Sequence, residues 1–290
     1  MAFASPFKPK GQIMVQSQDA ILPGETLPVE IRITPDEEIQ PRQVRAELVG
    51  EETYYVTETR RDARGNLRTQ TESKTNTFAR IVQTLAEQPT LFKGVEQKWN
   101  CTLQLPPDAP PTCHGQVVNI RWTLKAVLDV PKRADLSQEK PLNVLCPSLQ
   151  MADMPVLPAE NTYKEVTLIL KAQRAAFAGS TLKGQLTLQV KDKISVRSIR
   201  VELVQAEKAG TRQQDKVIST TQIPGAASFN QSESPSFEFS MDIPAESPPT
   251  VLYVNSNLHW KVKAVIDRKM TTDFNVEQEL FVFNAPKITG

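Results

Sequence analysis

The sequence predicts an all-β chain made of two tandem β-sandwich domains. Three observations predict this: an internal repeat, a period-2 alternation of apolar residues in both copies, and Pro-rich connections at equivalent points of the copies. A chain of 290 residues also suits two domains of about 140 residues each.

The first block of the repeat is gapless. At an offset of 155 residues, segment 13–49 lies on segment 168–204 with about eleven identities in 37 positions, where ordinary amino-acid frequencies predict about two. Gly24 falls on Gly179, and Glu47-Leu48-Val49 falls on Glu202-Leu203-Val204. The two halves of the chain are therefore copies of one unit.

A second block repeats at an offset of 138 residues. Segments 105–112 and 243–250 share the pattern apolar-Pro-x-x-x-Pro-Pro-Thr, and Trp122 falls on Trp260. The two offsets differ by 17, so the first copy carries 17 extra residues, which lie between Gly50 and Lys98.

Each copy has the pattern of strands. Apolar residues alternate with mostly polar or smaller ones over 120–130, 186–190 and 258–266, which predicts strands with one buried face. Trp122 and Trp260 occupy equivalent positions, so we expect both in the core. Gly24 and Gly179 each precede a strand, where a tight turn is expected. Segment 77–87 fits either an amphipathic helix or a strand.

The domain boundaries follow from a stretch with three prolines and no periodicity, between Cys146 and Pro158. We expect a first domain over residues 1–147, a stiff Pro-rich linker over 148–160, and a second domain over 161–290. Short antiparallel strands separated by turn signals give each domain the form of a two-sheet sandwich.

These motifs resemble the arrestin-like family. The resemblance rests on the turn glycine before the strand at 24–33, and on the Pro-Pro-Thr connection followed by an aromatic strand with Lys-Ala-Val-apolar-Asp. It covers nearly the whole chain and implies two immunoglobulin-like β-sandwich domains in an arrestin-like arrangement. It is closest in character to compact scaffold branches, such as retromer arrestin-like subunits and bacterial sporulation-control proteins. The resemblance implies a role as scaffold or adaptor.

Composition limits the kinds of function. The 34 Lys and Arg nearly cancel the 33 Asp and Glu, so no general field attracts nucleic acid, and we expect no nucleic-acid partner. The chain shows neither a signal-peptide pattern nor an apolar run long enough to span a bilayer. Three cysteines make an odd number without Cys-x-x-Cys spacing. These features favour a cytoplasmic protein.

The repeat argues against catalytic residues. Cys101 corresponds to Phe239 and Cys113 to Val251, so both cysteines replace apolar residues and are expected to be buried. Cys113 and His114 are adjacent and would point to opposite faces of a strand. The sequence has no nucleotide-binding loop, no serine-hydrolase motif and no Cys/His cluster with metal-site spacing. We therefore expect no catalytic, cofactor or metal residues and no enzymatic activity.

The 17 extra residues contain the candidate binding site. Segment 54–68 predicts a long hairpin that turns near Arg64-Gly65-Asn66 and is rich in arginine. It is either a solvated tip or a basic surface for an acidic or phosphorylated partner. Lys8 and Lys10 only approximate the adjacent lysines with which receptor-binding arrestins contact phosphates, because Pro9 separates them. The candidate partner-binding residues are Lys8, Lys10, Arg60, Arg61, Arg64 and Arg68.

The main hypothesis is a non-enzymatic cytoplasmic adaptor that binds another protein through sheet edges, the groove between domains and the basic hairpin. Peripheral membrane contact and a homodimer paired at sheet edges stay open. The alternative function is a structural or adhesive β-sandwich module that self-associates.

Overall fold

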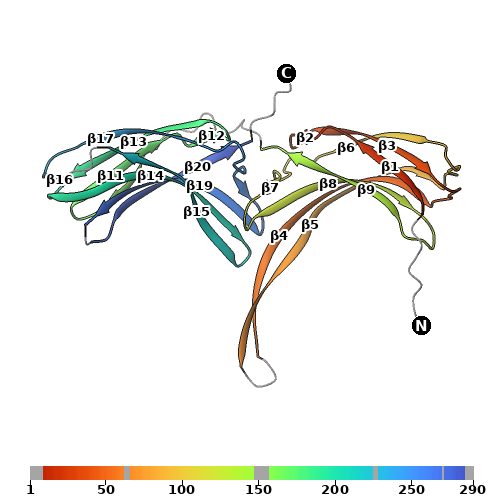
Figure 1. Ribbon diagram of the computed structural model, residues 1–290, viewed down its shortest axis with the longest axis horizontal. Coiled ribbons are helices and arrows are strands. Elements are labelled where there is room, and N and C mark those ends of the chain that lie inside the picture. The colour runs from red at the N-terminus through yellow and green to blue at the C-terminus, as the bar shows by residue number, and fades with distance from the viewer. Residues whose placement is uncertain (1–8, 62–65, 147–156, 225–227, 270, 285–290) are drawn as a thin grey trace. The chain divides into compact units, whose positions relative to one another are not determined.

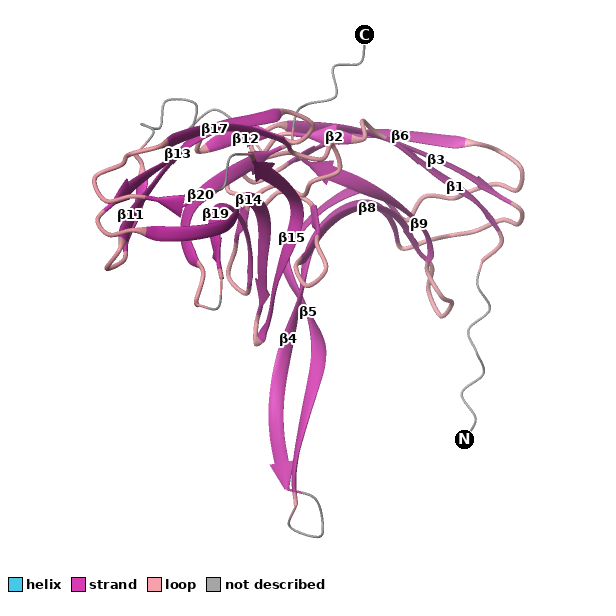
Figure 2. Ribbon diagram, turned by 60° about the vertical axis from the view of Figure 1, so that its left-hand side comes forward, coloured by secondary structure: helices cyan, strands magenta, loops and turns pink. Residues whose placement is uncertain are grey.

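The structure, a computed structural model, describes residues 9–61, 66–146, 157–224, 228–269 and 271–284. Within these ranges every regular element is a β-strand (Figure 2). No helix able to span a membrane occurs among them. The chain divides into two compact units. The first comprises Met1–Thr53, Ser73–His114 and Asn119–Leu145; the second comprises Tyr54–Glu72, Gly115–Val118 and Cys146–Gly290.

Nine strands precede residue 145 (Figure 1). They are β1 (Gly11–Gln16), β2 (Ala20–Ile21), β3 (Thr26–Pro35), β4 (Gln43–Arg61), β5 (Leu67–Glu87), β6 (Gln97–Gln104), β7 (Cys113–His114), β8 (Asn119–Asp129) and β9 (Leu136–Val144). One sheet has the order β1-β3-β6 and the other the order β2-β9-β8-β4-β5, with β7 paired to β8. The two sheets form a sandwich.

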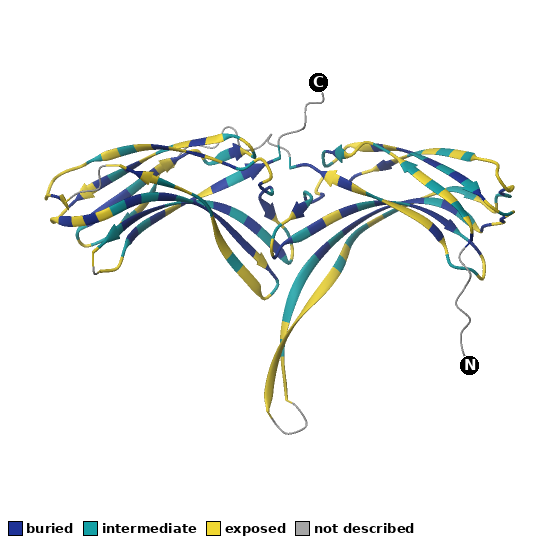
Figure 3. Cartoon of the chain, in the orientation of Figure 1, coloured by how far each residue is buried: buried dark blue, intermediate teal, exposed yellow. Residues whose placement is uncertain are grey.

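The core of this sandwich comes from the period-2 pattern. Alternate residues of β3, from Leu27 to Ile33, are buried, and so are those of β8 from Ile120 to Leu128. Figure 3 shows the same alternation of buried and exposed residues along the strands of both units. Burial of these side chains from water is the main force that holds the two sheets face to face.

Eleven strands follow residue 158 among the described residues. They are β10 (Ala159–Thr162), β11 (Val166–Ala172), β12 (Ala175–Phe177), β13 (Thr181–Val190), β14 (Ile194–Ala209), β15 (Arg212–Ile223), β16 (Ser228–Phe229), β17 (Ser236–Asp242), β18 (Val251–Leu252), β19 (Ser256–Arg268) and β20 (Phe274–Phe283). Their sheets have the orders β10-β11-β13-β17 and β12-β20-β19-β14-β15, with β16 on β14 and β18 on β19.

The second sandwich repeats the first strand by strand. Shifted by 155 residues, β3 coincides with β13, and shifted by 138 residues, β7 coincides with β18. The additional strands are β10, which covers the edge of β11, and β16. The counterpart of β11 is β1, which ends its own sheet.

The Pro-rich connections are fixed by the same hydrogen bonds in both copies. The indole Nε1 of Trp122 donates to the carbonyl of Pro110 at 2.9 Å, and that of Trp260 to the carbonyl of Pro248 at 3.1 Å. Trp122 and Trp260 are both buried, as the sequence predicted. Each tryptophan thus fills the core and satisfies its one donor at the connection.

A buried carboxylate holds a loop within the second unit. Glu207 on β14 is 4% exposed and accepts hydrogen bonds from the backbone N–H groups of Gln116, Val117 and Val118 at 3.0, 2.7 and 2.9 Å. Gln205 donates to the same carboxylate at 2.5 Å. A buried charge is stable only when it is satisfied in this way.

The predicted all-β, duplicated sandwich architecture is confirmed. Segment 77–87, for which a helix and a strand were both open, is a strand, because β5 pairs with β4 along the sheet. Gly24 and Gly179 adopt φ values of 83° and 82°, a region that favours glycine, in the turns predicted for them. The predicted domain boundaries stay a prediction, and most of the linker, residues 147–156, lies outside the described residues.

Candidate partner-binding surface

The hairpin of β4 and β5 is held at its distal end by threonine pairs. The hydroxyl groups of Thr57 and Thr71 lie 3.0 Å apart, and those of Thr59 and Thr69 lie 3.1 Å apart. Both pairs belong to one antiparallel register, since the sum of the residue numbers is the same. Cross-strand threonine pairs of this kind stabilise a sheet that has no apolar face.

The opposite face of the hairpin carries charge. In the register of the threonine pairs, Arg60 on β4 lies beside Arg68 on β5. Like charges at directly opposed positions destabilise a strand pair unless neighbouring anions offset them. Arg60 donates from Nε to Oε2 of Glu58 at 3.0 Å, and its side chain stays 78% exposed.

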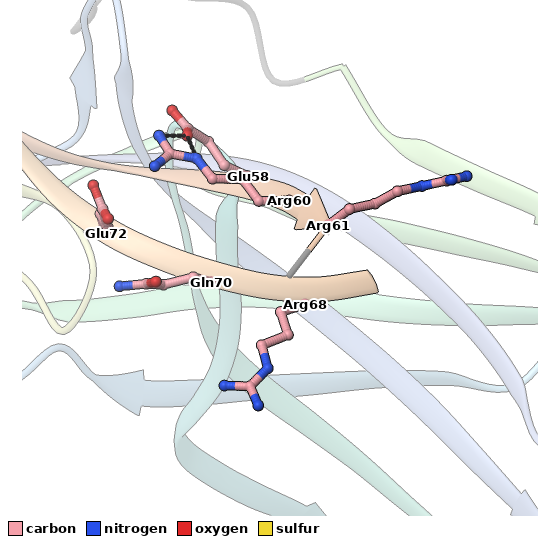
Figure 4. Close-up of a pocket in the computed structure, with 6 residues that line it drawn as sticks. All are labelled: Glu58, Arg60, Arg61, Arg68, Gln70 and Glu72. Atoms are coloured by element: carbon pink, nitrogen blue, oxygen red, sulfur yellow. Dashed lines mark hydrogen bonds and ion pairs between the residues drawn. The ribbon is translucent and has the colours of Figure 1, made fainter. Parts of the chain in front are cut away.

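These side chains surround a shallow pocket of about 150 Å³ (Figure 4). Its lining consists of Glu58, Arg60, Arg61, Arg68, Gln70 and Glu72. Figure 4 shows Arg60 turned back along Glu58, whereas Arg61 and Arg68 extend away from the two strands. The pocket is too small for a folded partner, so the arginines present an exposed surface and not an enclosed site.

The structure brings three of the six candidate residues together. The other three do not line this pocket or lie outside the described residues. Arg60, Arg61 and Arg68 line the pocket. Arg64 and Lys8 lie outside the described residues. Lys10 is exposed and precedes β1 in the first unit, where its carbonyl accepts a hydrogen bond from the backbone N–H of Asp36 at 3.1 Å.

Sequence reasoning missed two residues beside the hairpin. Within the second unit, the guanidinium carbon of Arg212 lies 5.0 Å from the ring centre of Tyr55, a cation–π contact. The next residue towards the N-terminus, Thr211, donates from its backbone N–H to the carbonyl of Tyr55 at 2.8 Å. Arg212 therefore places a positive charge beside Tyr55 of β4, although it is not among the residues that line the pocket. Because Arg212 is far from the hairpin in the sequence, no sequence pattern predicted its contact with Tyr55.

Two further hollows lie at equivalent places in the copies. One, of about 620 Å³, is lined by segments 16–18, 28–30 and 100–102; the other, of about 660 Å³, is lined by segments 171–173, 183–185 and 238–240. Shifted by the two offsets of the repeat, the lining segments of the first hollow coincide with those of the second, although the side chains differ. The hollows therefore follow from the backbone arrangement that the two copies share and not from particular side chains. No group of three or more His, Cys, Asp or Glu in the described ranges is placed to hold a metal ion.

The comparison with protein families agrees with this architecture. The family model of the arrestin (or S-antigen) C-terminal domain matches residues 14–148, which include nearly all of the strands from β1 to β9. No curated protein matches the chain. Residues 14–148 therefore form a domain of the arrestin-like family, on the all-β fold that the structure shows.

Proposed function

We propose that the chain is a non-enzymatic cytoplasmic adaptor that binds an acidic or phosphorylated segment of another protein. The observation that carries this proposal is the exposed cluster of Arg60, Arg61 and Arg68, which come from both strands of the hairpin. A guanidinium group binds carboxylate or phosphate oxygens through two parallel hydrogen bonds, so such a cluster suits an anionic partner. The arrestin-type domain supports a protein-binding role, since domains of this family are generally adaptors.

The outer edge of β1 supports a second point of contact. Ile169 on β11 is partly covered by β10, whereas its counterpart Met14 on β1 is 48% exposed, at an edge that has no neighbouring strand among the described residues. An extended segment of a partner can add to such an edge through main-chain hydrogen bonds. Lys10, and Lys8 before it in the sequence, would then supply positive charge near the start of the strand.

The test is capture of a partner from a lysate of the host organism with the full chain as bait. One variant reverses the charge of the hairpin at Arg60, Arg61, Arg64 and Arg68 to Glu. A matched control variant reverses four exposed lysines of the second sandwich, Lys171, Lys183, Lys191 and Lys193, and so makes the same change in net charge.

We expect a specific protein to be retained by the wild type and by the control, and to be reduced at least about tenfold on the hairpin variant. Equal retention by all three baits would remove the hairpin from the proposal. If none of the baits retains a specific protein, the adaptor function itself is contradicted.

A further inference from the structure

The outer edge of β5 is an exposed strand edge. β5 ends the order β2-β9-β8-β4-β5, so one of its two edges has no neighbouring strand among the described residues. Every residue from Asn66 to Thr75 is exposed. A further strand can therefore reach this edge without displacing side chains that are packed elsewhere.

The distal hairpin also lacks what usually stabilises a sheet. A two-stranded ribbon is at best marginally stable in water, and three or more strands or a packed apolar face are normally needed. The threonine pairs Thr57–Thr71 and Thr59–Thr69 lie on one face. The other face carries charged and amide side chains, namely Glu58, Arg60, Arg68, Gln70 and Glu72. Addition of strands at the β5 edge would supply the missing neighbours.

The sequence of this edge is complementary to itself. If two copies of β5 run antiparallel about an axis at Gln70, Arg68 of each copy lies opposite Glu72 of the other. In the same register Thr69 lies opposite Thr71, which repeats the threonine pairing seen inside the hairpin. Opposite charges and threonine pairs at directly opposed positions are both stabilising.

Arg68 and Glu72 of one strand cannot pair with each other. Arg68 and Glu72 are four residues apart, which separates their Cα atoms by about 13 Å in an extended strand. In an antiparallel pair of strands, directly opposed residues have Cα atoms only about 4.5–5.5 Å apart. A second copy therefore brings together charges that a single strand holds apart.

We propose that β5 pairs edge to edge with β5 of a second copy of this chain, antiparallel and two-fold symmetric about Gln70. The pairing joins the two hairpins into one four-stranded sheet, β4-β5-β5-β4. It covers nine residues of each strand, from Asn66 to Lys74. An interface of this length is smaller than a standard stable one, so the dimer is a weak, concentration-dependent one. It does not depend on the proposed adaptor function.

Two of the neighbouring registers oppose like charges. An axis at Thr71 would oppose Arg68 to Lys74, and an axis at Glu72 would oppose that carboxylate to itself. An axis at Ser73 would oppose Glu72 to Lys74 and Thr71 to Thr75, so it is a competing register that the experiment must separate from the Gln70 axis.

The first experiment is sedimentation equilibrium of the full chain over a range of concentrations. Glu72→Arg should weaken self-association about tenfold, because the two-fold axis doubles the effect of each changed pair. The double variant Arg68→Glu/Glu72→Arg exchanges the charges and should restore association. Both substituted positions, Arg68 and Glu72, are exposed, so we expect the fold to be preserved. A chain that stays monomeric at every concentration, or a double variant that is not restored, overturns the proposal.

The second experiment locates the axis by disulfide formation. In the proposed register Gln70→Cys meets its own copy within the Cα distance that a disulfide requires, whereas Ser73→Cys is about 20 Å from its copy. A non-reducing gel should therefore show a dimer for Gln70→Cys and none for Ser73→Cys or the wild type, which controls for the native cysteines. The reverse result would overturn the Gln70 axis, and no dimer for either variant would overturn the pairing.

Discussion

At the scale of single residues, the two copies fill the same space with different side chains. In the first copy Val29 on β3 is directly opposite Cys101 on β6; in the second, Gly184 is directly opposite Phe239. A Cβ atom on Gly184 would lie 2.4 Å from the Cζ atom of Phe239, so the ring occupies the room that a side chain would need. A larger residue on one strand is thus balanced by a smaller one on its partner.

This exchange predicts strong coupling between two positions. Gly184→Val should lower the free energy of unfolding by about 1–3 kcal/mol through overpacking, and Phe239→Cys should lower it by about 3 kcal/mol through a cavity. The double variant restores the pair found in the first copy and should recover most of the loss. Urea unfolding of the full chain measures all three. Losses that simply add in the double variant would show that the two side chains do not share one space.

The sequence predicted part of this residue-scale arrangement. Alignment with apolar residues predicted that Cys101 and Cys113 are both buried; Cys113 is buried, whereas Cys101 is only partly buried. The compensating change at Gly184 could not be inferred, because strand pairing between residues far apart in the chain decides which side chains share a space. The contact of Arg212 with Tyr55 was missed for the same reason.

At the scale of elements, a threonine ends each Pro-rich connection and fixes it to the last strand of its sandwich. The backbone N–H of Val144 donates to Oγ1 of Thr112 at 2.9 Å, and Oγ1 donates to the carbonyl of Leu142 at 3.1 Å. In the second copy, the backbone N–H of Val282 donates to Oγ1 of Thr250 at 2.9 Å. The hydroxyl group replaces ladder partners that proline cannot supply.

We predict that Thr112→Val lowers the free energy of unfolding by about 1–3 kcal/mol, because the N–H of Val144 and the carbonyl of Leu142 both lose a partner. Thr112→Ser keeps the hydroxyl group and is the matched control, with a smaller loss expected. Chemical unfolding followed by tryptophan fluorescence compares them. A loss for Thr112→Val no larger than that for Thr112→Ser would contradict the assignment to the hydrogen bonds.

A charged group joins β4 to β5 at the base of the hairpin. Glu47 is 3% exposed and accepts hydrogen bonds from Nε of Arg45 at 2.5 Å and from Nη2 of Arg80 at 2.9 Å. Burial alone would raise the pKa of Glu47, but the two guanidinium groups outweigh burial and hold the pKa below its ordinary value.

The lowered pKa of Glu47 predicts a pH dependence of stability. A carboxyl group whose pKa is lower in the folded state stabilises the fold above the unfolded pKa of about 4.3, and this stabilisation is lost as the pH falls through the lowered value. We therefore expect Glu47→Gln to be less stable than the wild type at pH 7 and the difference to shrink below about pH 4. Unfolding free energies measured from pH 7 to pH 3 test this. A difference that stays constant over that range would contradict it.

Element prediction succeeded where one face is buried and was ambiguous where it is not. The strands that contain Trp122 and Trp260 have a clear apolar alternation because they face the core. Segment 77–87 is only partly buried, so its apolar residues fit both the helical period and the strand period. Pairing with β4 makes it a strand. The four-residue strand β10 begins in the stretch predicted as the linker and extends past its predicted end at residue 160, and it is too short for a period to appear.

At the scale of the whole molecule, the duplication was visible in the sequence because both blocks keep their spacing. In the sequence, the differences between the copies were visible only as a change of offset. The candidate binding surfaces lie at these differences. The first copy has the longer hairpin, with β4 running on to Arg61 past Tyr54, the counterpart of the last residue of β14. It also lacks a counterpart of β10 in the described residues, which leaves the edge of β1 open.

The central claim is that the basic end of this hairpin contacts a protein partner. Hydrogen–deuterium exchange of the full chain, alone and with the captured partner, tests it most directly, at a concentration where sedimentation shows a single species of the free chain. The account predicts slower amide exchange in residues 57–61 and 67–74 when the partner is bound. Unchanged exchange in both segments, with protection appearing elsewhere in the chain, would contradict it.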